Sequence, residues 1–162
     1  MSDAKTTAPA NSPARPRGCT HDKLRRLMRR LSQHYDARLR PVGLKTTQYS
    51  LLGRAVLLGP VRPVDLADAM GLKASTLTRN LKPLIAAGWI RLDPGPDARS
   101  RLVSATDAGR QKMVDARAHW REAQGALATQ LGADRVIALH ALIDESLALL
   151  PHADDEPGAT DE

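Results

Sequence analysis

The stretch "PVDLADAMGLKASTLTRNLKPLIAAGWIRL" (Pro63 to Leu92) decides the fold. Its first segment, 63–70, reads as a short helix that opens on proline, at a position where the missing amide proton costs little. Gly71 breaks this segment, and a second helical segment follows almost at once. Two short helices joined by a turn of three or four residues that contains glycine describe a helix-turn-helix.

The second helix has two chemically distinct faces, because each residue advances ~100° around a helix axis. One stripe holds only hydroxyls and cations, at Ser75, Thr78, Arg79 and Lys82. The opposite stripe is apolar, at Leu77, Leu81 and Leu84. Pro83 lies inside this helix and removes the amide that would bond the carbonyl of Arg79, so we expect a bend or a loosened last turn.

The segments around this stretch predict a winged helix-turn-helix. Upstream, a helix over 22–40 has an apolar stripe opposite an arginine-rich face, and a helix over 46–58 has Thr46 or Thr47 as a candidate cap. Downstream of Gly88, the runs "WIRL" and "RLVSA" read as two strands joined by the loop "DPGPDARS". Helix, helix, helix, hairpin is the order of a winged module.

Two more helices follow the hairpin. Thr106 is the expected cap of a helix over 107–131, which would be roughly 37 Å long at ~1.5 Å per residue, more than a small winged module can cover. A last helix covers 133–150. Three amphipathic helices outside the winged module indicate a helical dimerisation region, with a monomeric bundle as the alternative. The fold class is therefore mainly α with a small β-hairpin: a winged helix-turn-helix plus a helical dimerisation region.

The chain divides into three parts on composition. Residues 1–19 form a basic tail and residues 151–162 an acidic tail, and both are expected to be disordered because they lack large apolar residues in any periodic pattern. Residues 20–150 form one domain, in which 46–106 make the winged DNA-binding module. Residues 20–45 and 107–150 supply the dimerisation helices.

Charge is separated along the chain, which carries a formal net charge of +6. Residues 20–106 hold 16 Lys or Arg against six Asp or Glu, whereas residues 107–162 hold five against 11. A basic front part and an acidic rear part suggest a surface that binds a polyanion. A general surplus of arginine is the plainer interpretation of composition alone.

Several classes of protein are disfavoured by the sequence. No apolar run approaches the ~18 to 20 residues of a membrane span, and the N-terminus lacks the apolar segment of a signal peptide, so we expect a cytoplasmic protein with no membrane partner. A single cysteine, Cys19, cannot form an internal disulfide. No nucleophile–base pair, phosphate-binding loop or metal-ligand spacing is present, so we expect no catalytic residue, no cofactor and no metal.

Spaced motifs across residues 22–150 resemble the MarR family of winged-helix transcription regulators. The motifs are Leu66-Ala67, Thr78-Arg79, Gly88-Trp89-Ile90, Asp97 to Arg99, Thr106 to Gly109, and the upstream element with Gln48 and Tyr49. Arg62 departs from the pattern, because relatives usually offer a Ser or Thr cap there, and it predicts a poorer start for the first short helix.

The resemblance implies a homodimer that binds a pseudo-palindromic operator in double-stranded DNA, usually as a repressor. Each recognition helix would enter a major groove and each wing a flanking minor groove. Hydroxyls and cations bond phosphates and base edges, whereas a carboxylate would repel the DNA backbone. The predicted DNA-binding residues are Ser75, Thr76, Thr78, Arg79, Lys82, Asp97, Arg99 and Arg101. Arg99 is the candidate for the minor groove, and Asp97 would steady the wing.

Three questions stay open at this point: the effector, the role of Cys19 and the class of protein. The resemblance implies release from DNA by a small aromatic acid, the candidate effector. Cys19, near His21 and Lys23 at the start of the first helix, is either a redox sensor that responds to oxidants or an inert thiol. The chain as a whole is either this DNA-binding regulator or a winged-helix protein-interaction module that does not bind DNA, and an enzyme is the least favoured class.

Overall fold

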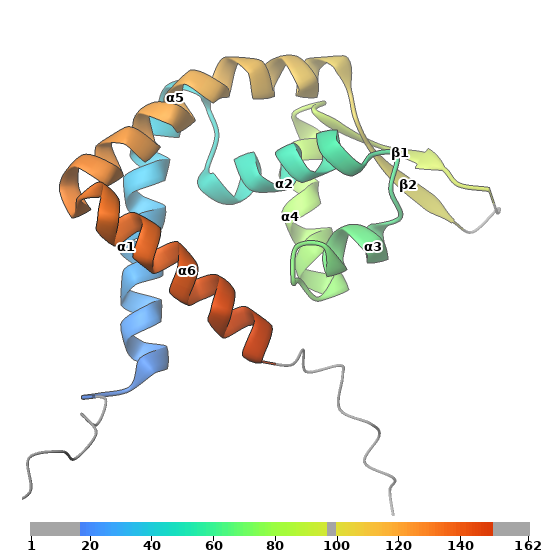
Figure 1. Cartoon of the computed structure of the whole chain (residues 1–162). Coiled ribbons are helices and arrows are strands. Elements are labelled where there is room, and N and C mark those ends of the chain that lie inside the picture. Colours follow the sequence, from blue (N-terminus) through green and yellow to red (C-terminus); the bar gives the residue numbers. More distant parts are fainter. Residues whose placement is uncertain (1–16, 97–99, 151–162) are drawn as a thin grey trace, which may run out of the picture.

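The computed structural model describes residues 17–96 and 100–150 (Figure 1). The elements, in chain order, are α1 (Thr20–Leu39), the 3-10 turn η1 (Arg40–Val42), α2 (Thr46–Leu58), α3 (Pro63–Asp68), α4 (Ala74–Ala86), β1 (Ile90–Pro94), β2 (Arg101–Ala105), α5 (Asp107–Leu131) and α6 (Ala133–Leu149). This order and these element types confirm the predicted fold class. The predicted tails, 1–19 and 151–162, lie outside the described residues except for 17–19.

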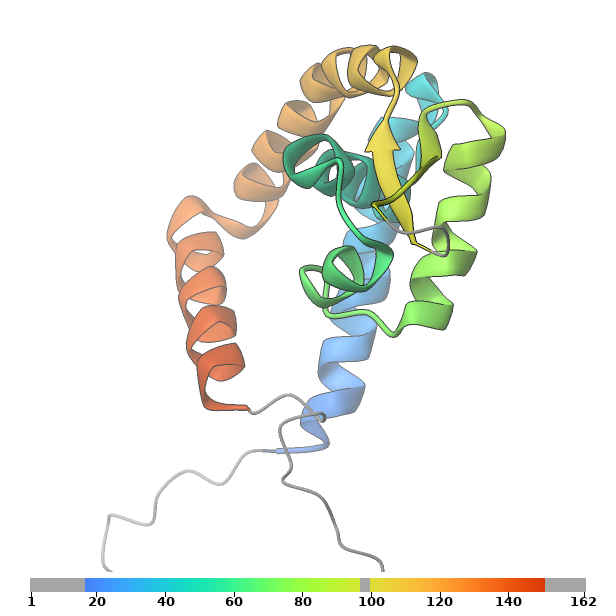
Figure 2. The same cartoon turned by 90° about the vertical axis from the view of Figure 1, so that its right-hand side faces the viewer.

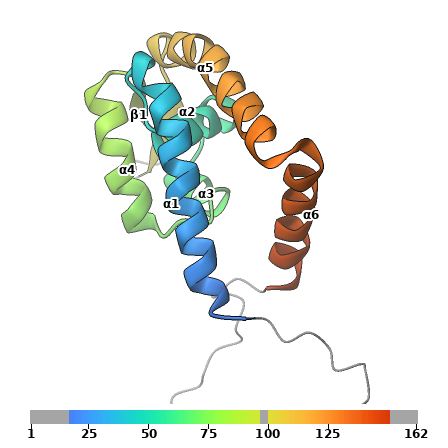
Figure 3. The ribbon, with the colours of Figure 1, turned by 90° about the vertical axis from the view of Figure 1, so that its left-hand side faces the viewer.

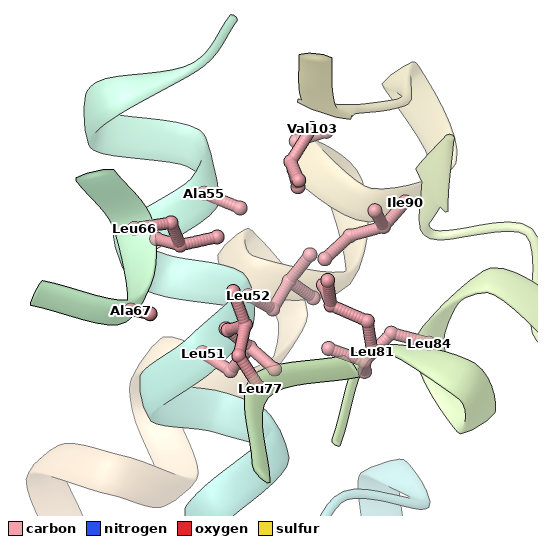
Figure 4. Close-up of a cluster of buried hydrophobic side chains, with 11 residues drawn as sticks. Leu51, Leu52, Ala55, Leu66, Ala67, Leu77, Leu81, Leu84, Ile90 and Val103 are labelled. Atoms are coloured by element: carbon pink, nitrogen blue, oxygen red, sulfur yellow. The ribbon is translucent and has the colours of Figure 1, made fainter. Parts of the chain in front are cut away.

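The core of the winged module is aliphatic and lies where α2, α3, α4 and the hairpin meet (Figure 4). Leu52, Leu66 and Leu84 are fully buried in it. The predicted inward stripe of α4 is confirmed, because Leu77, Leu81 and Leu84 are at most 4% exposed. Burial of such side chains stabilises the fold by about 1.5–3 kcal/mol each, and it fixes which face of α4 points outward.

The hairpin pairs β1 with β2 in antiparallel register, with Ile90 opposite Ala105 and Pro94 opposite Arg101. The first strand therefore starts one residue later than predicted and includes Asp93 and Pro94, which had been assigned to the loop. Pro94 is tolerated because it ends a strand at the edge of a two-stranded sheet, where no ladder bond needs its amide. A bridge between Val61 and Val103 attaches the segment before α3 to β2.

The start of α2 differs from the prediction, because neither Thr46 nor Thr47 caps this helix. Lys45 is the N-cap residue, and its backbone amide donates to Oε1 of Gln48 at 2.9 Å. Thr46 is the first helical residue, and both its amide and its hydroxyl donate to Oδ1 of Asp36, at 2.6 and 2.7 Å. Asp36 belongs to α1, so a tertiary contact rather than a local cap fixes where α2 begins.

The joint between the hairpin and α5 depends on Thr106 and Gly109. The Thr106 hydroxyl accepts the Gly109 amide at 3.0 Å, as the predicted cap requires, and donates to the carbonyl of Gly88 at 2.6 Å. A Cβ on Gly109 would collide with the backbone carbonyl of Trp89. Glycine is therefore required at this position by close backbone approach, and the joint holds the hairpin against α5.

The apolar stripe of α5 is covered within the same chain, mainly by α1 and α2. Ala116 and Ala123 are fully buried, and Trp120 stacks on Tyr49 with ring centroids 6.0 Å apart. His34 of α1 lies 2.9 Å from the carbonyl of Ala123 through Nε2. Because a carbonyl only accepts, Nε2 must carry the proton. These contacts cover much of the α5 stripe without a second chain, as the monomeric alternative in the sequence analysis would require.

The last helix, α6, remains largely uncovered. It leaves α5 at a bend of 104° and packs mainly against the end of that helix (Figures 2 and 3). None of its residues is buried, and Ile137, Leu142 and Leu147 are each more than 60% exposed. The first half of α1 also exposes apolar side chains, at Leu24 and Met28.

Among the described residues, no single helix is long and apolar enough to cross a membrane. Only α5 and α6 taken together meet that test of length and composition, and a 104° bend separates them.

Candidate nucleic-acid interface

The helix-turn-helix is built by α3, α4 and the turn between them. Gly71 adopts a left-handed φ of 61°, which side chains disfavour, and the amide of Leu72 bonds the carbonyl of Ala67 at 2.9 Å. α3 ends at Asp68, two residues earlier than predicted, and the turn uses the freed residues. Buried Leu66 and Ala67 then hold α3 against the apolar stripe of α4, so the other stripe of α4 faces outward.

The outward face of α4 carries the predicted binding residues. Ser75, Thr78, Arg79 and Lys82 are exposed, and Thr76 is half-buried. α4 contains no Asp or Glu, and within the described residues no ion pair engages Arg79 or Lys82. The two cations are therefore available to an external anion at little cost in lost internal contacts.

The hydroxyl of Thr78 is already committed as a donor. It donates to the carbonyl of Ala74 at 2.9 Å, one helical turn earlier. In this rotamer the oxygen can still accept a hydrogen bond, and the methyl group is free for an apolar contact. The side chain therefore suits an amino group or a thymine methyl at a base edge better than a phosphate oxygen, which can only accept.

The first short helix has no side-chain cap, as the sequence predicted. Arg62 is its N-cap residue and forms a two-pronged pair with Asp65, at 2.7 Å from Nε and 2.6 Å from a terminal nitrogen. The Arg62 guanidinium, by hydrogen bonding, holds the pKa of the Asp65 carboxyl below its usual value. Asp65 also lies in the first turn, where a negative charge is favoured. This ion pair links the N-cap residue to the first turn but does not bond the free backbone amides that a Ser or Thr cap would satisfy.

One of the three predicted wing residues lies in the described part of the hairpin. Arg101 begins β2 and is exposed. On β1, Arg91 pairs with Asp93 at 2.8 Å, and this hydrogen bond lowers the pKa of the Asp93 carboxyl. Asp97 and Arg99 lie outside the described residues. The base of their loop is closed by a bond of 3.0 Å from the amide of Gly95 to the carbonyl of Ser100.

A cleft of about 260 Å³ lies between the start of α2 and the middle of α4, and the sequence had not indicated it. Its lining residues are Lys45, Thr47, Gln48, Arg79, Asn80 and Pro83. None of them is acidic. Their two groups are more than 30 residues apart in the chain, so no local pattern places them together. Only the acid-free run around Lys45 is a signal that the sequence itself carries.

Cys19 is exposed and occupies the N-cap position of α1, where its carbonyl accepts the amide of Lys23 at 3.1 Å. No group of three or more His, Cys, Asp or Glu residues that could hold a metal ion occurs in the described part of the chain.

The fold and this outward cationic face define a winged helix-turn-helix protein of the kind found in transcriptional regulators, and similarity to known proteins agrees. A sequence profile described as MarR family matches residues 42–100. The multiple antibiotic resistance protein MarR of Salmonella typhimurium is 32% identical over 113 residues, which are 67% of this chain and 77% of that protein. The chain belongs to the MarR family, whose members are transcriptional regulators and not enzymes.

Two further relatives show the extent of the similarity. The uncharacterised regulator YwoH of Bacillus subtilis is 30% identical over 84 residues, which are 52% of this chain and only 61% of YwoH, less than two thirds of its length. The M. tuberculosis transcriptional regulator MosR in complex with DNA is 33% identical, with a TM-score of 0.65 and coverage of 80% of this chain and 98% of MosR. A second crystal structure of MosR gives 30% identity and a TM-score of 0.68.

Proposed function

We propose that this protein is a DNA-binding transcriptional regulator whose α4 enters the major groove while its hairpin reaches the flanking minor groove. The observation that carries the proposal is the composition of the outward face of α4. This face combines exposed hydroxyl groups with two cations that have no ion-pair partner among the described residues, and it contains no acidic residue. The solved complex of the related MosR with DNA supports it.

The proposed contacts follow from chemistry and position. Arg79 fits a bidentate contact to a guanine edge, and Lys82, one turn later, fits a phosphate. Thr78 fits a base edge as an acceptor or through its methyl group. The remaining proposed contacts are Ser75 and Thr76 on α4, Arg101 on β2, and Asp97 and Arg99 in the wing loop beyond the described residues.

We further propose that two copies pair through α6 and the first half of α1, with residues 20–45 and 107–150 as the dimerisation helices. An entirely unburied helix with apolar side chains at Ile143 and Leu147 is costly in water unless another surface covers it. A two-fold dimer presents two copies of α4 to successive turns of a pseudo-palindromic operator. Binding there would block transcription, so the dimer would act as a repressor.

Release from DNA by a small aromatic acid or by oxidation of Cys19 stays a prediction. A second cleft of about 470 Å³, lined by Asp36, Arg40, Gly43, Leu44, Lys45 and Gln48, is where we place the aromatic acid. Arg40 and Lys45 would pair with its carboxylate. His34 and Trp120 are engaged in packing and hydrogen bonding elsewhere.

The test is a titration of duplex binding against salt, using sites selected from random DNA. Phosphate neutralisation predicts a steep fall of log affinity with log salt concentration. Arg79→Ala should lower affinity for the selected site by about five- to 150-fold, because a good bidentate pair discriminates by about 1–3 kcal/mol. It should also relax base preference at one position of each half-site.

Arg54→Ala, which removes an exposed arginine of α2 outside the proposed DNA contacts and the proposed dimer surface, is the matched control and should change affinity little. A wild-type protein that binds no duplex at low salt would favour the alternative, a winged-helix module that binds proteins only.

A further inference from the structure

The cleft between α2 and α4 is a cluster of hydrogen-bond donors with no acid in its lining. Lys45, Thr47 and Gln48 line it from α2, and Arg79, Asn80 and Pro83 line it from α4. Two cations from separate elements face one small space. Within the described residues neither Lys45 nor Arg79 forms an ion pair. Like charges gathered in this way are unfavourable unless an anion or solvent compensates them.

The hydrogen bonds at the start of α2 decide which groups remain available to a ligand. Oε1 of Gln48 accepts the Lys45 amide, so the other end of that side chain, the NH₂ group, is the one left to donate. The Thr46 hydroxyl donates to Oδ1 of Asp36 and is therefore not free to donate to a ligand. Thr47, by contrast, lines the cleft.

We propose that this cleft binds one backbone phosphate of the DNA duplex, held by Lys45, Thr47 and Asn80 beside Arg79. The inference rests on the proposed function and adds contacts that lie outside the helix-turn-helix and the wing. A phosphodiester carries one negative charge and only accepting oxygens, which matches a lining of ammonium, guanidinium, hydroxyl and amide donors.

The position of the cleft gives this phosphate a specific role. Arg79 belongs both to the cleft and to the outward face of α4, so a phosphate seated there fixes the strand next to the bases that α4 would read. Phosphate contacts of this kind set register and orientation and carry no sequence information of their own. Lys45 is therefore a positioning residue for α4.

The experiment measures duplex affinity of the full chain for Lys45→Met, which removes the charge and keeps most of the aliphatic stem. At ~0.1 M salt we expect a loss of about three- to tenfold that is uniform across operator sequences. The slope of log affinity against log salt should fall by about 0.9 per bound chain. Arg79→Ala should instead alter base preference.

A set of operators, each with one neutral methylphosphonate, identifies the phosphate. At one position of each half-site, the methylphosphonate should lower the affinity of the wild-type protein but should not lower the affinity of Lys45→Met any further. This result would show that Lys45 and that phosphate act together. Thr47→Val should weaken binding at the same position. Lys45→Arg should restore the salt slope.

Arg54→Met is the matched control, because it removes an exposed cation of α2 that does not line the cleft and makes the same change in net charge. Thermal unfolding of every variant separates lost contacts from lost folding. Titration of the DNA-free protein with inorganic phosphate at constant ionic strength should show no saturable site, since a single phosphate ion lacks the neighbouring contacts of a duplex.

Three results would overturn the inference while leaving the proposed function intact: Lys45→Met binding like Arg54→Met, no operator phosphate coupled to Lys45, or tight binding of free phosphate that Lys45→Met abolishes. The last would assign the cleft to a free anion. A wild-type protein that binds no duplex would overturn both proposals together.

Discussion

At the scale of single residues, Thr106 has more partners than a helix cap needs. Its hydroxyl accepts the Gly109 amide within α5 and donates to the carbonyl of Gly88, just before β1. Its own amide bonds the carbonyl of Trp89 at 3.0 Å. Thr106 therefore links the start of α5 to the start of the hairpin. Gly109, three residues later, has no Cβ that would collide with the backbone of Trp89.

We expect Thr106→Val to lower the free energy of unfolding by about 1–2 kcal/mol, since it keeps the shape and removes both hydroxyl bonds. Thr106→Ser should retain most of the stability. Urea denaturation followed by circular dichroism measures the difference. Thr129→Val is the matched control, because that exposed hydroxyl bonds only the carbonyl of Gly125 in its own helix. An equal effect of the two valine variants would show that the joint contributes nothing.

At the scale of elements, α4 continues through Pro83 to Ala86. The last turn persists beyond the proline, because buried Leu81 and Leu84 hold both sides of it against the core. The carbonyl of Arg79 still lacks its helical amide partner, since proline has none. Pro83 is exposed and lines the cleft, so the proline side chain itself is not needed for the core.

Pro83→Ala should therefore stabilise the protein, by roughly 2–2.6 kcal/mol. Proline inside a helix costs about 3 kcal/mol relative to alanine, and the extra freedom of the unfolded alanine chain offsets only about 0.4–1 kcal/mol. Pro63→Ala supplies the contrast, because proline at the start of α3 is well placed and its removal should destabilise slightly. Thermal unfolding of the two variants decides the sign, and a destabilised Pro83→Ala would contradict this account of α4.

At the scale of the whole molecule, the winged module is a closed core whereas α6 is a surface without a partner in the single chain. The sequence favoured pairing of two chains because the stripe of α5 was too long for a winged module. The structure gives a different reason for pairing, since the apolar stripe of α5 is covered mainly by its own chain, whereas the largest group of exposed apolar side chains lies on α6 and the first half of α1.

Leu147→Asp should convert the proposed dimer into monomers, because a charge in a packed apolar interface is strongly unfavourable. Sedimentation equilibrium measures the mass, and affinity for a two-half-site duplex should fall while helical content remains. Ala138→Asp places the same charge on the side of α6 opposite Leu147, nine residues away, and should leave the mass unchanged. A wild-type chain that sediments as a monomer would contradict the proposed assembly.

The sequence by itself determined the type and order of the elements, the inward stripe of α4, the cap at Thr106 and the membership of the MarR family. These features depend on residues a few positions apart, through helical periodicity, capping and turn preferences, and local patterns report them well. Boundaries shifted by one or two residues where tertiary contacts compete with local preference, as at Asp93 and at the end of α3.

Only the tertiary structure decided the features that join distant segments. Asp36 of α1 sets the start of α2, the backbone of Trp89 explains Gly109, and the cleft brings Lys45 beside Arg79. Each depends on how packed helices place groups that lie ten to more than 30 residues apart. That placement is fixed by burial of the whole core, so no short pattern in the chain encodes it.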